Sequence, residues 1–130
     1  MHNIEKYLNM LDITSNYGPE KAYEEAVKCK SQGGDLLDLL PFYEMVIARS
    51  AEISYRYARF VIKGRWEKGE DAISQSASWS YRYACDVIKG RWEKGEDAIS
   101  QHAAISYEYA RDVIKGRWEK GERSEEHTSE

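Results

Sequence analysis

Basic side chains recur along this chain at a fixed spacing of 26 residues, and they are the residues best suited to binding chemistry. There are three such sets. The first is Arg56 and Arg82, and Glu108 stands where its third member would be. The other two sets are complete and consist of Lys63, Lys89 and Lys115, and of Arg65, Arg91 and Arg117. Stacked repeats would place each set in a column, which can hold phosphate groups or the carboxylates of an acidic peptide. These eight residues form the candidate interaction surface.

The charge balance argues against a general nucleic-acid site. Residues 40–65 carry five basic and two acidic side chains, residues 66–91 carry four of each, and residues 92–117 carry four basic and five acidic. The basic excess is confined to the first of these segments, and the whole chain has a net charge of −4, whereas nucleic-acid binders are usually basic. We therefore expect the arginines mainly to pack over aromatic rings and to pair with Glu67 and Glu93.

Other reactive side chains do not form a recognisable catalytic or metal site. Glu67, Glu70 and Asp71 have the chemistry for acid–base work or for a hard cation, but they recur once per period, which favours a charged helix start. Cys85 and His102 each replace the residue found at the same place in other repeats, and no third partner for nucleophilic catalysis has a suitable spacing. We predict that the protein is not an enzyme and uses no cofactor or metal.

The elements that position these side chains follow from a tandem repeat. Residues 54–75 and residues 80–101 differ at two of 22 positions, so 20 residues recur unchanged. A fixed period of this length indicates stacked supersecondary units rather than a closed globule. Each unit begins at a tryptophan, or at Leu40 in the diverged first unit, which gives repeats at 40–65, 66–91 and 92–117 and a partial unit at 118–122.

Each unit is predicted to contain two helices. The first is short, from Trp66 to about Gln75 in the second unit, and has acidic residues in its first turn. The second runs from about Ala77 to Lys89 and is predicted to end at Gly90. The residues between the two helices of each unit are Ser50, Ser76 and His102. A serine oxygen accepts a free backbone N–H group at a helix start, so the two serines are expected to be good caps and His102 a poor one.

The second helix is apolar around most of its girth when it is projected at about 100° per residue. Such a helix needs neighbours on more than one side. Cys85 lies on the one polar stripe, so we expect it to be at least partly exposed, and we expect Trp92 to be buried. The stripe of tyrosines is interpreted as core, because a thin array can bury a tyrosine ring while its hydroxyl reaches water.

The segments on either side of the repeats differ from them in sequence. Residues 1–39 are predicted to form an N-terminal helical capping segment, with helices over about 4–11 and 19–30, because an array needs its first apolar face covered. Residues 123–130, RSEEHTSE, stand where the repeat predicts DAISQ and resemble the translation of a sequencing-library adapter. We expect a non-native or disordered tail there, and more repeats in the natural protein.

The strings SYRYARFVIKGRWEKGE, SYRYACDVIKGRWEKGE and SYEYARDVIKGRWEKGE resemble a family of short tandem repeats found in uncharacterised phage and metagenomic proteins. The family's pattern is similar to Y-x-Y-A-x-D-V-(I/L)-x-G-R-W-x-x-(A/G)-E, and the resemblance covers about residues 40–122. It implies an α-helical array of viral or bacterial origin and supplies no catalytic residues. Phe60 departs from the aspartate of this pattern, and Cys85 departs from the arginine of the other two units.

The predicted fold is an all-α α-solenoid of two-helix, 26-residue repeats with an N-terminal helical cap. A repeated surface without a convergent polar site favours a non-enzymatic scaffold that binds a protein or peptide along its inner face. The alternatives are a nucleic-acid or polyanion binder that uses the basic columns, and a structural array that self-associates end to end.

The sequence also predicts where the protein is found. No apolar run approaches the roughly 18 residues of a membrane span, and the first residues lack a secretory signal. The two cysteines lack metal-site spacing and suit a reducing compartment. We expect a cytoplasmic protein without a membrane partner, located in the bacterial host if it is phage-encoded.

Overall fold

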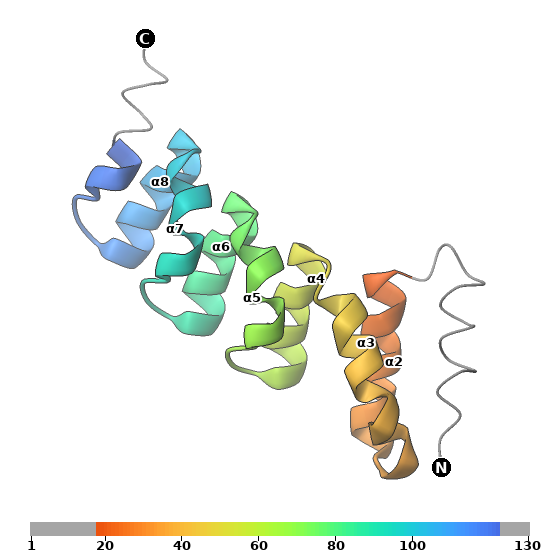
Figure 1. The fold of residues 1–130 in the computed structure, drawn as a ribbon. Helices are drawn as coiled ribbons and strands as arrows, with labels where there is room; N and C mark the ends of the chain where they lie inside the picture. The colour runs from red at the N-terminus through yellow and green to blue at the C-terminus, as the bar shows by residue number, and fades with distance from the viewer. Residues whose placement is uncertain (1–17, 123–130) are drawn as a thin grey trace.

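The computed structural model describes residues 18–122, and every regular element within them is helical (Figure 1). The all-α class is therefore confirmed, while the expectations for residues 4–11 and for the tail lie outside the described residues. In chain order the elements are α2 (Pro19–Gln32), the 3-10 helix η1 (Gly34–Leu39), α3 (Leu40–Ile47), α4 (Ala51–Arg56), the π-helix η2 (Tyr57–Ile62), α5 (Glu67–Ser74), α6 (Ala77–Tyr83), the π-helix η3 (Ala84–Ile88), α7 (Glu93–Ser100), α8 (Ala103–Tyr109) and the π-helix η4 (Ala110–Ile114).

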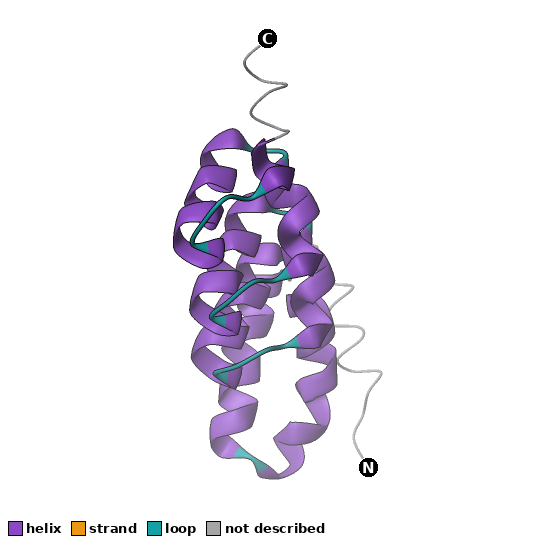
Figure 2. Cartoon of the chain, turned by 90° about the vertical axis from the view of Figure 1, so that its left-hand side faces the viewer, coloured by secondary structure: helices purple, strands orange, loops and turns teal. Residues whose placement is uncertain are grey.

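The helices follow one another in a row, from α2 at one end to α8 at the other (Figure 1). Each repeat contributes one helix pair, namely α3 with α4, α5 with α6 and α7 with α8. The short helices α3, α5 and α7 form one layer, in which each contacts the next. We call α4, α6 and α8, each together with the π-helix that continues it, the long helices. They form the second layer and also contact one another in order. Loops cross between the two layers on one side of the row (Figure 2). Side chains that lie 26 residues apart therefore come to equivalent places in successive pairs.

Serine caps start two of the long helices. The Ser50 hydroxyl oxygen accepts the backbone N–H of Ile53 at 3.1 Å, and the Ser76 oxygen accepts that of Trp79 at 3.3 Å. His102, at the same place before α8, makes no such bond. The predicted difference between serine and histidine at these starts is confirmed, and the reason is that a short hydroxyl side chain reaches the N–H group three residues on.

The long helices end differently from the prediction. Each widens into a π-helix and stops at a lysine in the left-handed region, with φ of 62° at Lys63, 60° at Lys89 and 62° at Lys115. The prediction that the helix ends at Gly90 is therefore wrong by one residue, because Lys89 supplies the left-handed turn that glycine usually provides. Gly90 itself does not adopt a positive φ.

The core is a repeated set of aromatic and aliphatic side chains. Trp92 is buried, as predicted, and its ring packs against Tyr83 with centroids 4.8 Å apart. Equivalent pairs of rings occur one repeat earlier and one repeat later. The side chains that are buried most completely recur in three sets, namely Tyr57, Tyr83 and Tyr109; Ile47, Ile73 and Ile99; and Ser54, Ser80 and Ser106.

A glycine allows α5 and α7 each to approach the long helix before it. A Cβ added at Gly95 would lie 2.6 Å from the Cβ of Ser80 and 2.7 Å from Cε3 of Trp92, which is closer than packed atoms can come. Gly69 meets the same obstruction from Ser54. The buried serine hydroxyl does not lose its hydrogen bond in this contact, because Ser80 donates to the carbonyl of Ile73 at 2.9 Å.

Helix α2 covers the first helix pair. It packs against α3 and also contacts α4, and it buries Ala22, Ala26 and Cys29. The ring of Tyr23 meets that of Tyr57 edge-on, with centroids 6.1 Å apart. The helix was predicted over about residues 19–30 and extends two residues further, to Gln32.

Candidate interaction surface

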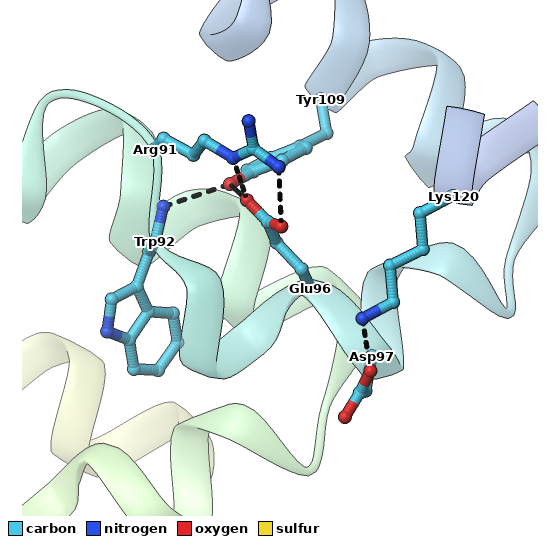
Figure 3. A network of polar contacts seen from close by, with 6 residues as sticks. All are labelled: Arg91, Trp92, Glu96, Asp97, Tyr109 and Lys120. Atoms are coloured by element: carbon cyan, nitrogen blue, oxygen red, sulfur yellow. Dashed lines mark hydrogen bonds and ion pairs between the residues drawn. The ribbon is translucent and has the colours of Figure 1, made fainter. Parts of the chain in front are cut away.

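A buried glutamate lies at the centre of a polar network that joins α7, α8 and the loop that precedes them (Figure 3). The Tyr109 hydroxyl donates to Oε2 of Glu96 at 2.7 Å and accepts the backbone N–H of Trp92 at 2.9 Å. Arg91 donates from Nε to Oε2 at 2.7 Å and from Nη2 to Oε1 at 3.1 Å. Both oxygens of the buried carboxylate are thus hydrogen-bonded, which offsets the cost of removing the charge from water.

The same network recurs one repeat earlier with closely similar geometry. Glu70 accepts hydrogen bonds from Tyr83 at 2.6 Å and from two nitrogens of Arg65 at 2.9 Å each. In the diverged first unit, Glu44 accepts from Tyr57 at 2.7 Å and from Lys68 at 3.0 Å. A polar cluster that is repeated in every unit serves the packing of the units rather than a single reaction centre.

The network sets the protonation of its members. Burial alone would raise the pKa of the Glu96 carboxyl, but the hydrogen bonds from Arg91 and Tyr109 outweigh burial and lower it below the ordinary value. The pKa of the Glu70 carboxyl is lowered in the same way by hydrogen bonds from Arg65 and Tyr83. The pKa of Tyr109 is raised, first by burial and then by the adjacent carboxylate. The glutamates are therefore ionised and the tyrosines are neutral donors at neutral pH.

A second contact links each long helix to the next one. Tyr55 donates to Asp86, and Tyr81 donates to Asp112 one repeat later. Arg59 pairs with Asp86 across the same interface at 3.3 Å. At the equivalent place of the second unit stands Cys85, and Asp112 pairs with its neighbour Arg111 at 2.7 Å instead of with an arginine of the preceding helix.

The predicted column of Arg65, Arg91 and Arg117 is engaged within the fold. Their side chains are exposed, but each guanidinium pairs with a glutamate five residues further along the chain. The expected pairing with Glu67 and Glu93 is wrong. The partners are Glu70 and Glu96 instead, and Glu122 in the last case, because the arginine crosses the loop to the carboxylate that turns into the core.

The column of Lys63, Lys89 and Lys115 is placed differently. All three side chains are exposed, and among residues 18–122 none of them forms an ion pair. Two of them flank a hollow of about 560 Å³ whose lining consists of Arg59, Lys63, Gly64, Cys85, Asp86, Val87 and Lys89. We call the three lysines the lysine edge.

Arg56 and Arg82 lie over aromatic rings, as the sequence predicts. The guanidinium of Arg56 is 5.2 Å from the ring centre of Tyr23, and that of Arg82 is 5.3 Å from the ring centre of Trp79. Arg56 also pairs with Glu52 on its own helix at 3.8 Å. These two arginines therefore cover apolar surface, and they are less available to a partner than the lysine edge.

The remaining sequence candidates do not assemble into one site. Cys85 is half-buried, which confirms its predicted partial exposure, and it lines the hollow beside the lysine edge. His102 is exposed at the start of α8 and is not part of that lining. Of the acidic set, Glu70 is buried in the network, whereas Asp71 is exposed and pairs with Lys94. Within residues 18–122 no group of three or more His, Cys, Asp or Glu side chains is placed to hold a metal ion.

Comparison of this chain with protein-family models, with curated proteins and with solved structures finds no match. In the part of the chain that the structure describes, no helix has both the length and the apolar character needed to cross a bilayer. The geometry of the repeats is therefore the basis for a functional assignment.

Proposed function

We propose that the chain is an α-solenoid that acts as a non-enzymatic scaffold and binds an acidic protein segment along the lysine edge. The observation that carries this proposal is the left-handed backbone at Lys63, Lys89 and Lys115. This conformation costs a residue with a Cβ about 1 kcal/mol, and glycine adopts it without that cost. A lysine at each of these turns is explained if its side chain serves a purpose that glycine cannot.

The charges of the other recurring basic residues support the same assignment. Arg65 and Arg91 neutralise buried glutamates, and Lys94 and Lys120 pair with aspartates of the preceding repeat. Among the recurring lysines and arginines of residues 18–122, those of the lysine edge form neither an ion pair nor a contact with an aromatic ring. Since such charges attract carboxylates and fix their register, the edge suits a ligand with acidic side chains at intervals.

The hollow beside the edge favours a polypeptide over a uniform polyanion. Its lining includes Asp86 and the apolar side chain of Val87 next to Lys63 and Lys89. A carboxylate repels a phosphate backbone, whereas a peptide can place a basic or an apolar side chain there. A nucleic acid on the same lysines remains the second candidate, because their charges are available to phosphates as well.

The test is retention of a partner from a bacterial lysate, which the resemblance of the repeats to phage and metagenomic proteins makes the suitable source. The bait is the full chain, and the lysate is divided into nuclease-treated and untreated halves. A protein retained from both halves, and lost with a bait that carries Lys63→Gln, Lys89→Gln and Lys115→Gln, is the expected result.

A matched control removes the same number of charges elsewhere. Lys68→Gln, Lys94→Gln and Lys120→Gln change lysines that pair with acidic residues of the fold, and this bait is expected to retain the partner. Retention that disappears with nuclease would assign the edge to nucleic acid. Equal retention by both triple variants would contradict a role for the lysine edge.

A further inference from the structure

We propose that the lysine edge also binds a column of glutamates on a second copy of this chain, with the two copies parallel and face to face. The column consists of Glu67, Glu93 and Glu119, and we call it the glutamate edge. The inference rests on the proposed function in one respect, because both require the lysine edge to bind acidic groups. A second copy would then compete with an acidic partner for the same lysines.

The two edges border one strip of the surface. Each lysine follows the last residue of a long helix, and each glutamate begins the short helical segment that comes next. The loops between them, residues 64–66, 90–92 and 116–118, cross on one side of the row (Figure 2). The strip therefore carries positive charge along one border and negative charge along the other, at the same repeat interval.

The glutamate edge forms no ion pair within the described part of the chain. Its three side chains are exposed, and among residues 18–122 none of them pairs with a lysine or an arginine. The arginines that the sequence would assign to them, Arg65 and Arg91, bind the buried Glu70 and Glu96 instead. The two edges thus carry opposite charges that do not pair with each other, although each glutamate stands four residues after a lysine.

A glycine recurs between the edges, at a place where the described residues do not require one. Gly64, Gly90 and Gly116 each follow a lysine of the edge. None of them has a positive φ, and a Cβ added at any of them would meet no atom within 4 Å. Neither the backbone nor the packing of residues 18–122 therefore explains the glycine. The missing side chain does allow another polypeptide to approach the loop backbone closely.

Charge determines how two such strips fit together. When two copies face each other with their rows parallel, a two-fold axis along the row places the lysine edge of each copy against the glutamate edge of the other. Each lysine then faces the glutamate of the same loop, and this match needs no particular distance because both edges share the 26-residue period. Antiparallel copies would place lysine against lysine, which is unfavourable.

The strip runs along the row and not across either end of it. Lys63, Glu67, Lys89 and Glu93 belong to repeats that have helices packed on both sides. Additional repeats would lengthen both edges and would not cover them. The interface that we propose is therefore a property of the repeat itself, and it suits a partner built from the same repeat.

Sedimentation velocity of the full chain, without any other protein, tests the inference. Dimers are expected at about 50 mM salt and monomers at about 500 mM, because salt screens exposed charges. Reversal of either edge alone should abolish the dimer at low salt, and an equimolar mixture of the two variants should restore it because their charges are complementary on both borders. The variants are Lys63→Glu, Lys89→Glu and Lys115→Glu in one chain, and Glu67→Lys, Glu93→Lys and Glu119→Lys in the other.

Two further variants separate the strip from a general effect of charge. A control with the same net charge as the reversed glutamate edge, changed at exposed positions of α2 and α4, should still form dimers; its substitutions are Glu20→Lys, Glu24→Lys and Glu52→Lys. A variant that keeps every charge should lose the dimer because side chains separate the loops; its substitutions are Gly64→Gln, Gly90→Gln and Gly116→Gln. Circular dichroism establishes that each variant is folded.

The outcomes for this inference and for the proposed function can be told apart. A chain that stays monomeric at low salt, a mixture that does not restore the dimer, or folded glycine variants that dimerise normally would overturn the inference. A lysate protein that is still lost with the three lysine-to-glutamine substitutions would then leave the proposed function in place. Conversely, dimers that respond as expected while no lysate protein depends on the lysines would support the second copy alone.

Discussion

Each interior repeat holds an ionised glutamate away from water by a tyrosine hydroxyl and an arginine, and this arrangement links stability to pH. The pKa of Glu70 and of Glu96 is lower in the folded protein than the ordinary 4.5. Just below 4.5 the unfolded chain therefore binds more protons than the folded one. The resulting stabilisation is fully present above that pH and is lost as the pH falls through the lower pKa of the folded state.

Glu96→Gln tests this linkage directly. The variant should have a free energy of unfolding lower by about 1–3 kcal/mol at neutral pH, because charge-assisted hydrogen bonds are replaced by weaker ones. It should also lose less stability than the natural chain when the pH is lowered below 4.5. Urea unfolding across this range provides the measurement. Glu93→Gln, at an exposed position of the same helix, is the control, and an identical pH profile for all three proteins would contradict the linkage.

His102 offers a second prediction at the residue scale. His102→Ser should stabilise the protein by about 1 kcal/mol, because serine at the equivalent starts caps the helix and histidine does not. Thermal or urea unfolding measures the change. Ser76→His should produce a loss of similar size, and a neutral result for both exchanges would mean that the caps do not limit stability.

Gly90 and Gly95 have different roles, although both lie in the repeated string IKGRWEKGE. Gly95→Ala should destabilise by about 1–3 kcal/mol, because the added methyl group collides with Ser80 and Trp92. Gly90→Ala should be neutral within about 1 kcal/mol, because the added Cβ meets no atom within 4 Å and the backbone does not need a positive φ. Unfolding of the two variants side by side distinguishes them, and equal losses would contradict the close packing at Gly95.

Helix boundaries were largely predictable because they depend on local chemistry. The short helix α5 runs Glu67–Ser74, close to the expected range from Trp66 to about Gln75. The start of the next helix was also predictable, because Ser76 caps it. The π-helices and the left-handed lysines were not predicted, because glycine follows each lysine and local preference assigns the turn to it.

The candidate surface was only half predictable. The spacing of the basic residues identified two equivalent columns, and nothing local distinguishes Arg91 from Lys89. The distinction arises in three dimensions, because Arg91 reaches Glu96 while Lys89 is exposed at the helix end and forms no ion pair with it. The glutamate and the tyrosine that share the network are 13 residues apart in every repeat, and that constant spacing was the available signal.

For the whole molecule, the recurring contacts join each helix pair to its neighbours on both sides. The Tyr83 hydroxyl joins α6 to Glu70 of α5 within one repeat, and Tyr55 with Asp86 joins consecutive long helices. Stability in such a row is a sum of unit and interface terms, so the charged residues used in these contacts are fixed by the fold. Among the recurring lysines and arginines of residues 18–122, those of the lysine edge are the set that neither ion pairs nor ring contacts explain.

The free energy of unfolding of a triple variant, Lys63→Gly, Lys89→Gly and Lys115→Gly, tests this account most directly. If the lysines are retained for a partner at a conformational cost, the variant should be more stable than the natural chain by about 1 kcal/mol for each site that folds with the array. Urea unfolding with circular dichroism gives the value. A variant that is equally stable or less stable would show that the lysines support the fold, and would contradict their assignment as the binding edge.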